Sequence, residues 1–142
     1  MSLVLIGGTP GTGKSSVAKF VAKNLEVELV ELGDLAENND CIKSRDDDRD
    51  TAIIDEDCLV AAIDDLLDGN DERMVIAGHY IDLIPPSKVD RAIILRTRPS
   101  LLRQRLEDRG YAKQKVQENV EAEVFGVCQM DALEVFDELQ VF

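Results

Sequence analysis

The sequence predicts an α/β fold in which a parallel sheet of about five strands is flanked by helices. Apolar runs of strand length recur along the chain, helical patterns separate several of them, and a glycine-rich segment follows the first run. The strand-like runs are Leu3–Ile6, Val27–Leu32, Thr51–Ile54, Met74–Ala77 and Ala92–Leu95. The helical patterns are Ser15–Leu25, Leu59–Leu67 and Leu101–Leu106, followed by one long helix along the apolar stripe from Val116 to Leu133. With 142 residues, the chain is expected to form one domain, residues 1–142.

The glycine-rich segment, Gly8–Ser15, has the pattern G-x-x-x-x-G-K-S. Its glycines allow turns with positive φ that direct backbone N–H groups at phosphate oxygens. Lys14 adds a positive charge for the β- and γ-phosphates, and the Ser15 hydroxyl is suited to Mg²⁺. The helix expected after it presents its positive dipole end to the same anion. A strand before and a helix after favour a nucleotide-binding phosphate loop (P-loop) over an ordinary turn.

Composition and charge narrow the class of protein and its partners. The chain is 44% hydrophobic and 32% charged, with a net charge of −13. Such a field repels nucleic acids and acidic membranes and favours a basic protein partner, although an acidic surface that aids solubility explains the charge equally well. No apolar stretch has spanning length and no leader is recognisable, so we expect a cytoplasmic protein without a membrane partner.

Three scattered cysteines, Cys41, Cys58 and Cys128, form no C-x-x-C pair. An odd number of separated thiols is typical of a reducing cytosol, so all three are expected to be small core residues. A structural zinc site is not expected, because the one histidine, His79, has no ligand cluster in the sequence.

A short basic stretch stands out in this acidic chain. Arg105 and Arg109 lie one helical turn apart, and Lys113 and Lys115 follow. The cluster is predicted to clamp the phosphates during transfer, as part of a lid. The alternative is an ion-pair network with neighbouring acidic residues at the surface.

Two strand ends carry further candidates. Asp55 and Asp57 follow a strand-like run, where side chains of a parallel sheet reach the ligand crevice, so they are candidates to hold Mg²⁺ or the acceptor nucleotide. The alternative is that one of them caps the next helix. His79 follows Ala77 at the end of another run and is a candidate to orient water or the γ-phosphate, or else a structural histidine.

Several segments in order along the chain together resemble the adenylate kinase isoenzyme 6 family. They are Gly8–Ser16, Gly33–Ala36, Ile54–Asp57, His79, Leu95–Thr97, Arg109–Tyr111 and Glu118–Glu123. The resemblance covers nearly the whole chain, and Arg109–Tyr111 and Glu118–Glu123 are its specific part.

The resemblance implies an adenylate-kinase-like P-loop fold with a short lid at about residues 108–118. It implies Mg²⁺-dependent phosphoryl transfer from ATP to AMP, ATPase activity, and a role in small-ribosomal-subunit assembly through a basic ribosomal protein. It also implies an acceptor-nucleotide region at about residues 31–54, a nuclear location in a eukaryote, and a cytoplasmic one in an archaeal-type cell. The predicted ATP-binding residues are Gly11, Thr12, Gly13, Lys14, Ser15, Ser16, Arg105 and Arg109, the catalytic ones are Lys14, His79 and Arg109, and the metal ligands are Ser15, Asp55 and Asp57.

The chain departs from the family pattern in two places. The family usually has Asp-x-His where this chain has Ala77-Gly-His79, so Mg²⁺ binding is expected to rest on Ser15, water, and Asp55 or Asp57. The sequence also ends at Phe142, short of the family's usual extent. We expect Val135–Phe142 to supply part of the last strand, or a closing helix to be missing.

Three functions remain open from the sequence. The first is an AMP kinase that uses ATP. The second is an ATPase that remodels a ribosomal complex and has little kinase activity. The third, which needs only the P-loop, is a kinase for another small acceptor, because the segment 37–50 has no readable preference for a base.

Overall fold

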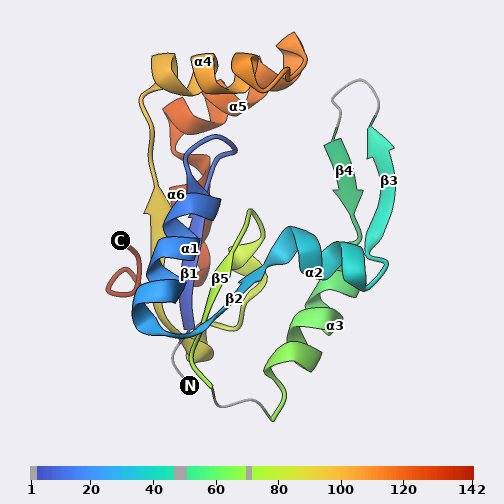
Figure 1. Cartoon of the computed structure of the whole chain (residues 1–142), viewed down its shortest axis with the longest axis vertical. Coiled ribbons are helices and arrows are strands. Elements are labelled where there is room, and N and C mark those ends of the chain that lie inside the picture. Colours follow the sequence, from blue (N-terminus) through green and yellow to red (C-terminus); the bar gives the residue numbers. More distant parts are fainter. Residues whose placement is uncertain (1–2, 47–50, 70–71) are drawn as a thin grey trace.

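The computed structural model describes residues 3–46, 51–69 and 72–142 (Figure 1). The strands are β1 (Leu3–Gly8), β2 (Glu28–Glu31), β3 (Ile42–Asp46), β4 (Thr51–Ile54), β5 (Met74–Ala77) and β6 (Val89–Leu95). The helices are α1 (Lys14–Leu25), α2 (Leu32–Asn38), α3 (Glu56–Leu67), α4 (Pro99–Asp108), α5 (Lys113–Phe125) and α6 (Val127–Val135). Two 3₁₀ turns, Ile81–Leu83 and Pro86–Lys88, connect β5 to β6. The predicted α/β class is confirmed.

The main sheet has the order β2-β5-β1-β6 within the described residues, and every pairing is parallel. Side chains alternate between its two faces, as the period of a strand requires. Val75 and Ala77 pack with Ala18 and Ala22 of α1 on one face, whereas Ile76 belongs to the larger core on the other. Because all four strands run in one direction, their carboxyl ends meet at one edge, where β1 leads into the P-loop.

Helices α4 and α5 pack on each other above the P-loop (Figure 1). They share a small core of their own, made of Leu102, Leu106, Val116 and Val120. A Cβ at Gly11 of the P-loop would lie 2.8 Å from Leu102 Cδ1, so this small core rests directly on the loop. Only a glycine allows that approach, since Gly11 also has φ +89°.

The run Thr51–Ile54 does not join the main sheet, which corrects the prediction of five parallel strands that included it. It forms β4, which pairs antiparallel with β3 in a separate hairpin, with Ile42 opposite Ile54. The physical reason is the short connection, because strands joined by a few residues can pair only antiparallel. Residues 47–50 of the predicted acceptor region lie outside the described residues, and α2 and β3 were not predicted individually.

The predicted final helix is interrupted. Gly126 has φ +66° and ends α5, and α6 begins at Val127. A left-handed residue terminates an α-helix, and glycine adopts that conformation without strain. The apolar stripe therefore continues across a sharp change of direction, which periodicity alone does not reveal.

The end of the chain extends the main sheet by one bridge. Val141 pairs in parallel with Ala92 of β6, supported by a bond from the Ile94 N–H to the Phe142 carbonyl. The prediction that Val135–Phe142 supplies part of the last strand is confirmed.

The prediction that all cysteines are separate thiols is wrong. Cys41 and Cys58 form a disulfide that joins the residue before β3 to the first turn of α3. The two residues are 17 positions apart, but the hairpin between them brings its two ends together. Cys128 is the free cysteine.

Candidate functional site

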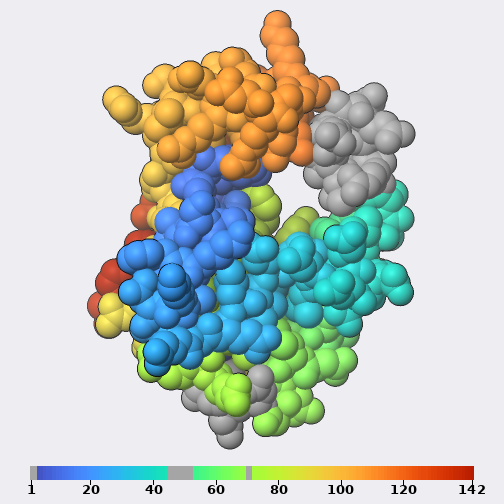
Figure 2. Space-filling view, viewed as in Figure 1, coloured from blue at the N-terminus to red at the C-terminus, as the bar shows by residue number. Residues whose placement is uncertain are grey.

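A pocket of about 730 Å³ opens between the P-loop and the two segments that the family resemblance implies, a lid at residues 108–118 and an acceptor region at residues 31–54. Figure 2 shows the surface hollowed between the blue P-loop side, the orange lid and the cyan hairpin side. Its walls come from five segments of the chain that are separated in sequence. The lining residues are Pro10, Gly11, Gly13, Lys14, Ser15, Ser16, Glu31, Gly33, Asp34, Ile54, Ala77, Gly78, His79, Tyr80, Arg109, Tyr111, Lys115, Glu118 and Asn119.

The P-loop holds its shape through its own backbone and side chains. Gly13 has φ +93° and forms the left-handed entry to α1. Lys14 Nζ donates to the Gly8 carbonyl at 2.8 Å, so the ammonium lies folded over the loop. Thr12, one of the predicted ATP-binding residues, is 8% exposed, and its Oγ1 donates to the Thr9 carbonyl at 2.7 Å. Thr12 therefore stabilises the turn from inside.

The pKa of Lys14 reflects its partial burial and the charged groups around it. The pKa of Lys14 is lowered to about 8, mainly by burial and also by the charge of Arg109, whereas Cys128 and Glu123 act in the opposite direction. A polyphosphate in the pocket would restore the positive form, because a nearby negative charge raises the pKa of an amine.

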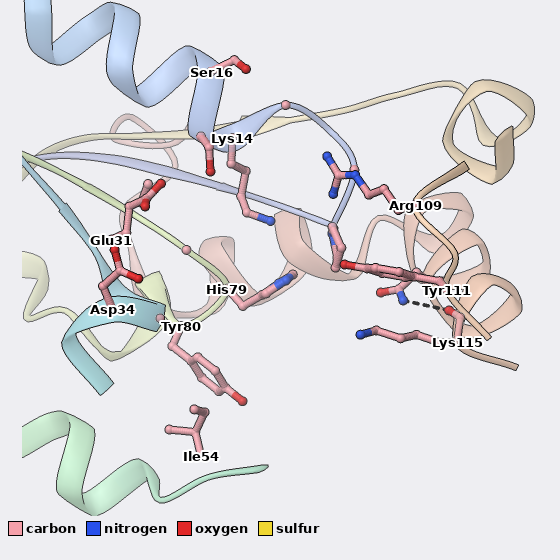
Figure 3. Close-up of a pocket in the computed structure, with 18 of the residues that line it drawn as sticks. Lys14, Ser16, Glu31, Asp34, Ile54, His79, Tyr80, Arg109, Tyr111 and Lys115 are labelled. Atoms are coloured by element: carbon pink, nitrogen blue, oxygen red, sulfur yellow. Dashed lines mark hydrogen bonds between the residues drawn. The ribbon is translucent and has the colours of Figure 1, made fainter. Parts of the chain in front are cut away.

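The predicted lid contributes two basic side chains, which lie on either side of the turn between α4 and α5. Arg109 and Lys115 line the pocket, and Lys115 Nζ lies 4.1 Å from the centre of the Tyr111 ring (Figure 3). Arg105 was predicted to contact phosphate, but its Nη1 donates to the Gly11 carbonyl at 3.0 Å. It thus fastens α4 to the P-loop, because α4 crosses directly over that carbonyl.

His79 projects into the pocket from the end of β5, facing Lys14 and Lys115 (Figure 3). His79 keeps an exposed face toward the pocket, but the protein packed around the ring, and then the positive charges of Lys14 and Lys115, lower its pKa to about 4. The ring is therefore neutral at physiological pH, when it can both donate and accept a hydrogen bond.

The opposite wall is acidic and aromatic. Glu31 and Asp34 line it from β2 and α2, and Tyr80 and Ile54 lie below them (Figure 3). The cations of the P-loop and lid and the carboxylates of this wall thus occupy different ends of one pocket. The separation suits a ligand whose charge is concentrated at the P-loop end.

The predicted metal ligands Asp55 and Asp57 are not brought to this wall. Asp55 is the N-cap of α3, where its Oδ1 accepts from the Cys58 N–H at 3.2 Å, and Asp57 is exposed in the first helical turn. The prediction assumed that β4 ends at the edge of the parallel sheet, which is wrong. The alternative interpretation, a helix cap, is the one observed for Asp55.

The donor set in the pocket fits a hard divalent cation that arrives with a nucleotide. In the described part of the chain, no three His, Cys, Asp or Glu side chains are grouped to hold a metal by themselves. Mg²⁺ usually keeps several waters and takes one or two protein oxygens besides the phosphates. The Ser15 hydroxyl and the Glu31 and Asp34 carboxylates supply oxygens of that kind in the same pocket.

The structure brings to one pocket five residues that the sequence singled out, namely Lys14, Ser15, Ser16, His79 and Arg109. Sequence reasoning did not single out Glu31, Asp34, Tyr80 or Asn119. Glu31 and Tyr80 follow strand-like runs, and this position is the signal by which they could have been found.

The fold and the pocket define the class of protein, a P-loop kinase-like phosphotransferase. A family model described as an AAA domain matches residues 4–126. The chain is 36% identical over 136 residues to the adenylate kinase isoenzyme 6 homolog of Saccharomyces cerevisiae, covering 94% of this chain and 68% of that protein. It is 38% identical over 135 residues to the homolog of Schizosaccharomyces pombe, covering 94% and 75%. A putative adenylate kinase of Pyrococcus abyssi is 36% identical over 132 residues, covering 93% and 69%.

The chain belongs to the adenylate kinase isoenzyme 6 family. Solved structures show the same fold at low identity. A shikimate kinase from Bacteroides thetaiotaomicron has a TM-score of 0.61 at 12% identity, covering 99% of this chain and 85% of that one. A gluconokinase from Sinorhizobium meliloti has a TM-score of 0.60 at 21% identity, covering 99% and 79%. Among the described helices, none has the length and apolar character needed to span a bilayer.

Proposed function

We propose that this protein is an Mg²⁺-dependent nucleoside monophosphate kinase that transfers the γ-phosphoryl group of ATP to AMP. The observation that carries the proposal is the shape of the site. One pocket has the P-loop and lid cations at one end and the acceptor region, with Glu31, Ile54 and Tyr80, at the other. The relatives named adenylate kinase support ATP and AMP as the two nucleotides.

The donor phosphates bind where backbone and charge are already arranged. The N–H groups of the P-loop and the α1 N-terminus surround the β-phosphate, and Lys14 moves from the Gly8 carbonyl to the phosphates. Arg109 and Lys115 then face the transferring group from the lid. In phosphoryl transfer most of the rate enhancement comes from such positioning and charge stabilisation.

The acceptor end is proposed to hold AMP between the lid and the acceptor region. Neutral His79 is placed to orient the attacking phosphate oxygen or a competing water. Mg²⁺, bound by Ser15 and water, would neutralise charge between the β- and γ-phosphates. When AMP is absent, water can take the acceptor's place, which accounts for the ATPase activity that we propose beside the kinase.

Formation of ADP from ATP and AMP tests the proposal directly. We expect two ADP for each ATP consumed, only when AMP and Mg²⁺ are both present. Parallel reactions with gluconate, shikimate and other nucleoside monophosphates examine the third possibility, another small acceptor. ADP formation that AMP does not increase would reject the kinase function.

A second candidate function is an ATPase that assists small-ribosomal-subunit assembly by binding a basic ribosomal protein. The net charge of −13 favours a basic partner, because complementary charge accelerates and orients association. Capture of small-subunit proteins on the immobilised chain, with and without ATP, tests it. We expect a basic protein to be retained and then released by ATP, and its absence would reject this role.

A further inference from the structure

The strand beside the P-loop ends without a carboxylate. β5 is the neighbour of β1, and its last residue, Ala77, lines the pocket below His79. Phosphate-loop enzymes commonly place an aspartate at the end of a neighbouring strand, where it holds the water shell of Mg²⁺. Ala77 cannot do this, so any carboxylate in that role must come from another position.

One strand further out, a carboxylate lies level with Ala77. β2 pairs with β5 in parallel, and the register places Glu31 opposite Ala77. Residues opposite each other in neighbouring strands stand on the same face of a sheet. The outer strand thus offers the acidic group that the inner strand lacks.

Packing identifies that face as the one that α1 covers. Ala77 contacts the cluster that contains Ala18 and Ala22 of α1. Leu29, two residues before Glu31, packs against the same cluster, so the period of the strand directs Glu31 to the same side. Ser15 lies in the first turn of α1 and faces the same pocket as Glu31.

The carboxylate of Glu31 is not used by local structure. Glu31 is the N-cap residue of α2, yet its side chain makes no capping hydrogen bond. The residue is partly buried and lines the pocket, and Figure 3 shows its carboxylate on the pocket side of β2. Asp34, by contrast, is exposed in the first turn of α2.

We infer that Glu31 holds the water shell of the nucleotide-bound Mg²⁺ opposite Ser15, in place of the carboxylate that Ala77 lacks. This inference rests on the proposed use of Mg·ATP. Neighbouring strands are about 4.8 Å apart, and glutamate is only one methylene longer than aspartate, so contact through water fits better than direct ligation. The carboxylate thus lies at the end of β2 instead of β5, at the same edge of the sheet.

Affinity for ATP, measured by calorimetry with Mg²⁺ and with EDTA, isolates this role from turnover. The ratio of the two dissociation constants gives the gain in affinity from Mg²⁺. Glu31→Gln is expected to leave the affinity in EDTA unchanged and to lower the Mg²⁺ gain about 10-fold, the usual loss when an outer-shell partner of a metal is removed. Glu28→Gln, at the exposed start of the same strand, is the matched loss of charge and should keep the full gain.

Rescue across the strand pair makes the test specific. The double variant Glu31→Gln/Ala77→Asp should recover the Mg²⁺ gain, because it returns a carboxylate to the neighbouring strand end. Three results would each overturn the inference. The first is an unchanged Mg²⁺ gain in Glu31→Gln, and the second is a larger loss of the Mg²⁺ gain in Asp34→Asn than in Glu31→Gln. The third is a wild-type affinity for ATP that does not depend on Mg²⁺. A normal Mg²⁺ gain with no AMP-dependent ADP formation would instead reject only the proposed kinase function.

Discussion

The two ends of the pocket are built in different ways. At the donor end, the P-loop is fixed by short contacts: Arg105 holds the Gly11 carbonyl, Lys14 holds the Gly8 carbonyl, and Leu102 packs on Gly11. At the acceptor end, the β3–β4 hairpin stands outside the main sheet and is tied at its base by the Cys41–Cys58 disulfide.

Because the two ends are built differently, we expect donor binding and acceptor binding to be perturbed by different substitutions. The donor end is proposed to bind a triphosphate, and its P-loop depends on backbone geometry that tolerates little change. Within the described residues, the β3–β4 hairpin forms a sheet of its own, separate from the sheet that leads into the P-loop. Changes at the donor end should therefore affect ATP, and changes at the hairpin base should affect the acceptor.

Loss of the P-loop ammonium is expected to have the largest effect. Lys14→Ala should lower kcat/KM for ATP by about 10²–10³-fold, because it removes a charge aimed at the transferring phosphate. The fold should persist, since the ammonium bonds only to the Gly8 carbonyl among the hydrogen bonds of the described chain. Steady-state kinetics and a thermal melt measure both. Lys23→Ala, exposed at the end of α1, is the control, and comparable turnover in the two variants would show that the loop is not the ATP site.

Removal of the disulfide is expected to affect the acceptor end. The double variant Cys41→Ser/Cys58→Ser should lose about 3 kcal/mol of unfolding free energy, the value for closing a loop of this size. The KM for AMP should rise severalfold while the KM for ATP stays nearly constant. Urea denaturation and initial rates provide the measurements, with Cys128→Ser as the control thiol. Equal changes in the two KM values would contradict the separation of the two ends.

Helix α5 is anchored by an ion pair between buried Glu123 and the half-exposed Arg96. Glu123 on α5 is 2% exposed and binds Arg96, which also donates to the Glu123 carbonyl at 2.7 Å and to Gln129 at 3.1 Å. Glu123→Gln should cost about 1–3 kcal/mol of stability and raise the KM for ATP more than that for AMP, because α5 carries Lys115 and Asn119 into the pocket.

Glu121→Gln, exposed two residues earlier on the same helix, is the matched control for the lid anchor. It should lie close to wild type in both stability and kinetics. A Glu123→Gln protein whose ATP and AMP constants shift together would indicate general destabilisation rather than a displaced lid.

The smallest expected effect is a fraction of a proton at His79. In the free protein the pKa of His79 is lowered to about 4, and bound polyphosphate should raise it toward its ordinary value of about 6.5. A pH of about 6 lies between these two pKa values, so ATP binding at that pH should be accompanied by proton uptake. Calorimetry in two buffers of different ionisation enthalpy measures the uptake, and His79→Gln should remove it. Equal uptake by both proteins would place the proton elsewhere.

The same shift sets the sign of the pH dependence of stability. Because the pKa of His79 is lower in the folded protein than in the unfolded chain, the unfolded chain binds more protons between about pH 4 and 6.5. The contribution of neutral His79 to the free energy of unfolding is present in full above this pH window. It is lost as the pH falls through the window.

The sequence predicted the donor end well because that chemistry is local. Lys14, Ser15 and Ser16 follow a strand and open a helix, so their placement depends on a few neighbouring residues. Arg109 was found for a similar reason, since it lies at the end of α4 before Gly110. Local geometry fixes these positions whatever the rest of the chain does.

The acceptor end could not be predicted in the same way, because it depends on pairing between distant segments. The polar segment that forms β3 has no apolar strand pattern, so its hairpin with β4 was missed, and the expected position of Asp55 and Asp57 followed from that error. The register that sets Glu31 beside Ala77 is also a tertiary property. The break at Gly126 was missed because the apolar period continues through it.

Displacement of a bisubstrate inhibitor, two adenosines joined by five phosphates, tests the central claim that one pocket binds donor and acceptor together. The account predicts one inhibitor per chain, Mg²⁺-dependent binding, and competition by ATP and by AMP separately. In Lys14→Ala the inhibitor should bind far more weakly, while AMP alone should bind as in the wild type. Displacement by ATP but not by AMP would contradict the account, because the pocket would then hold only the donor.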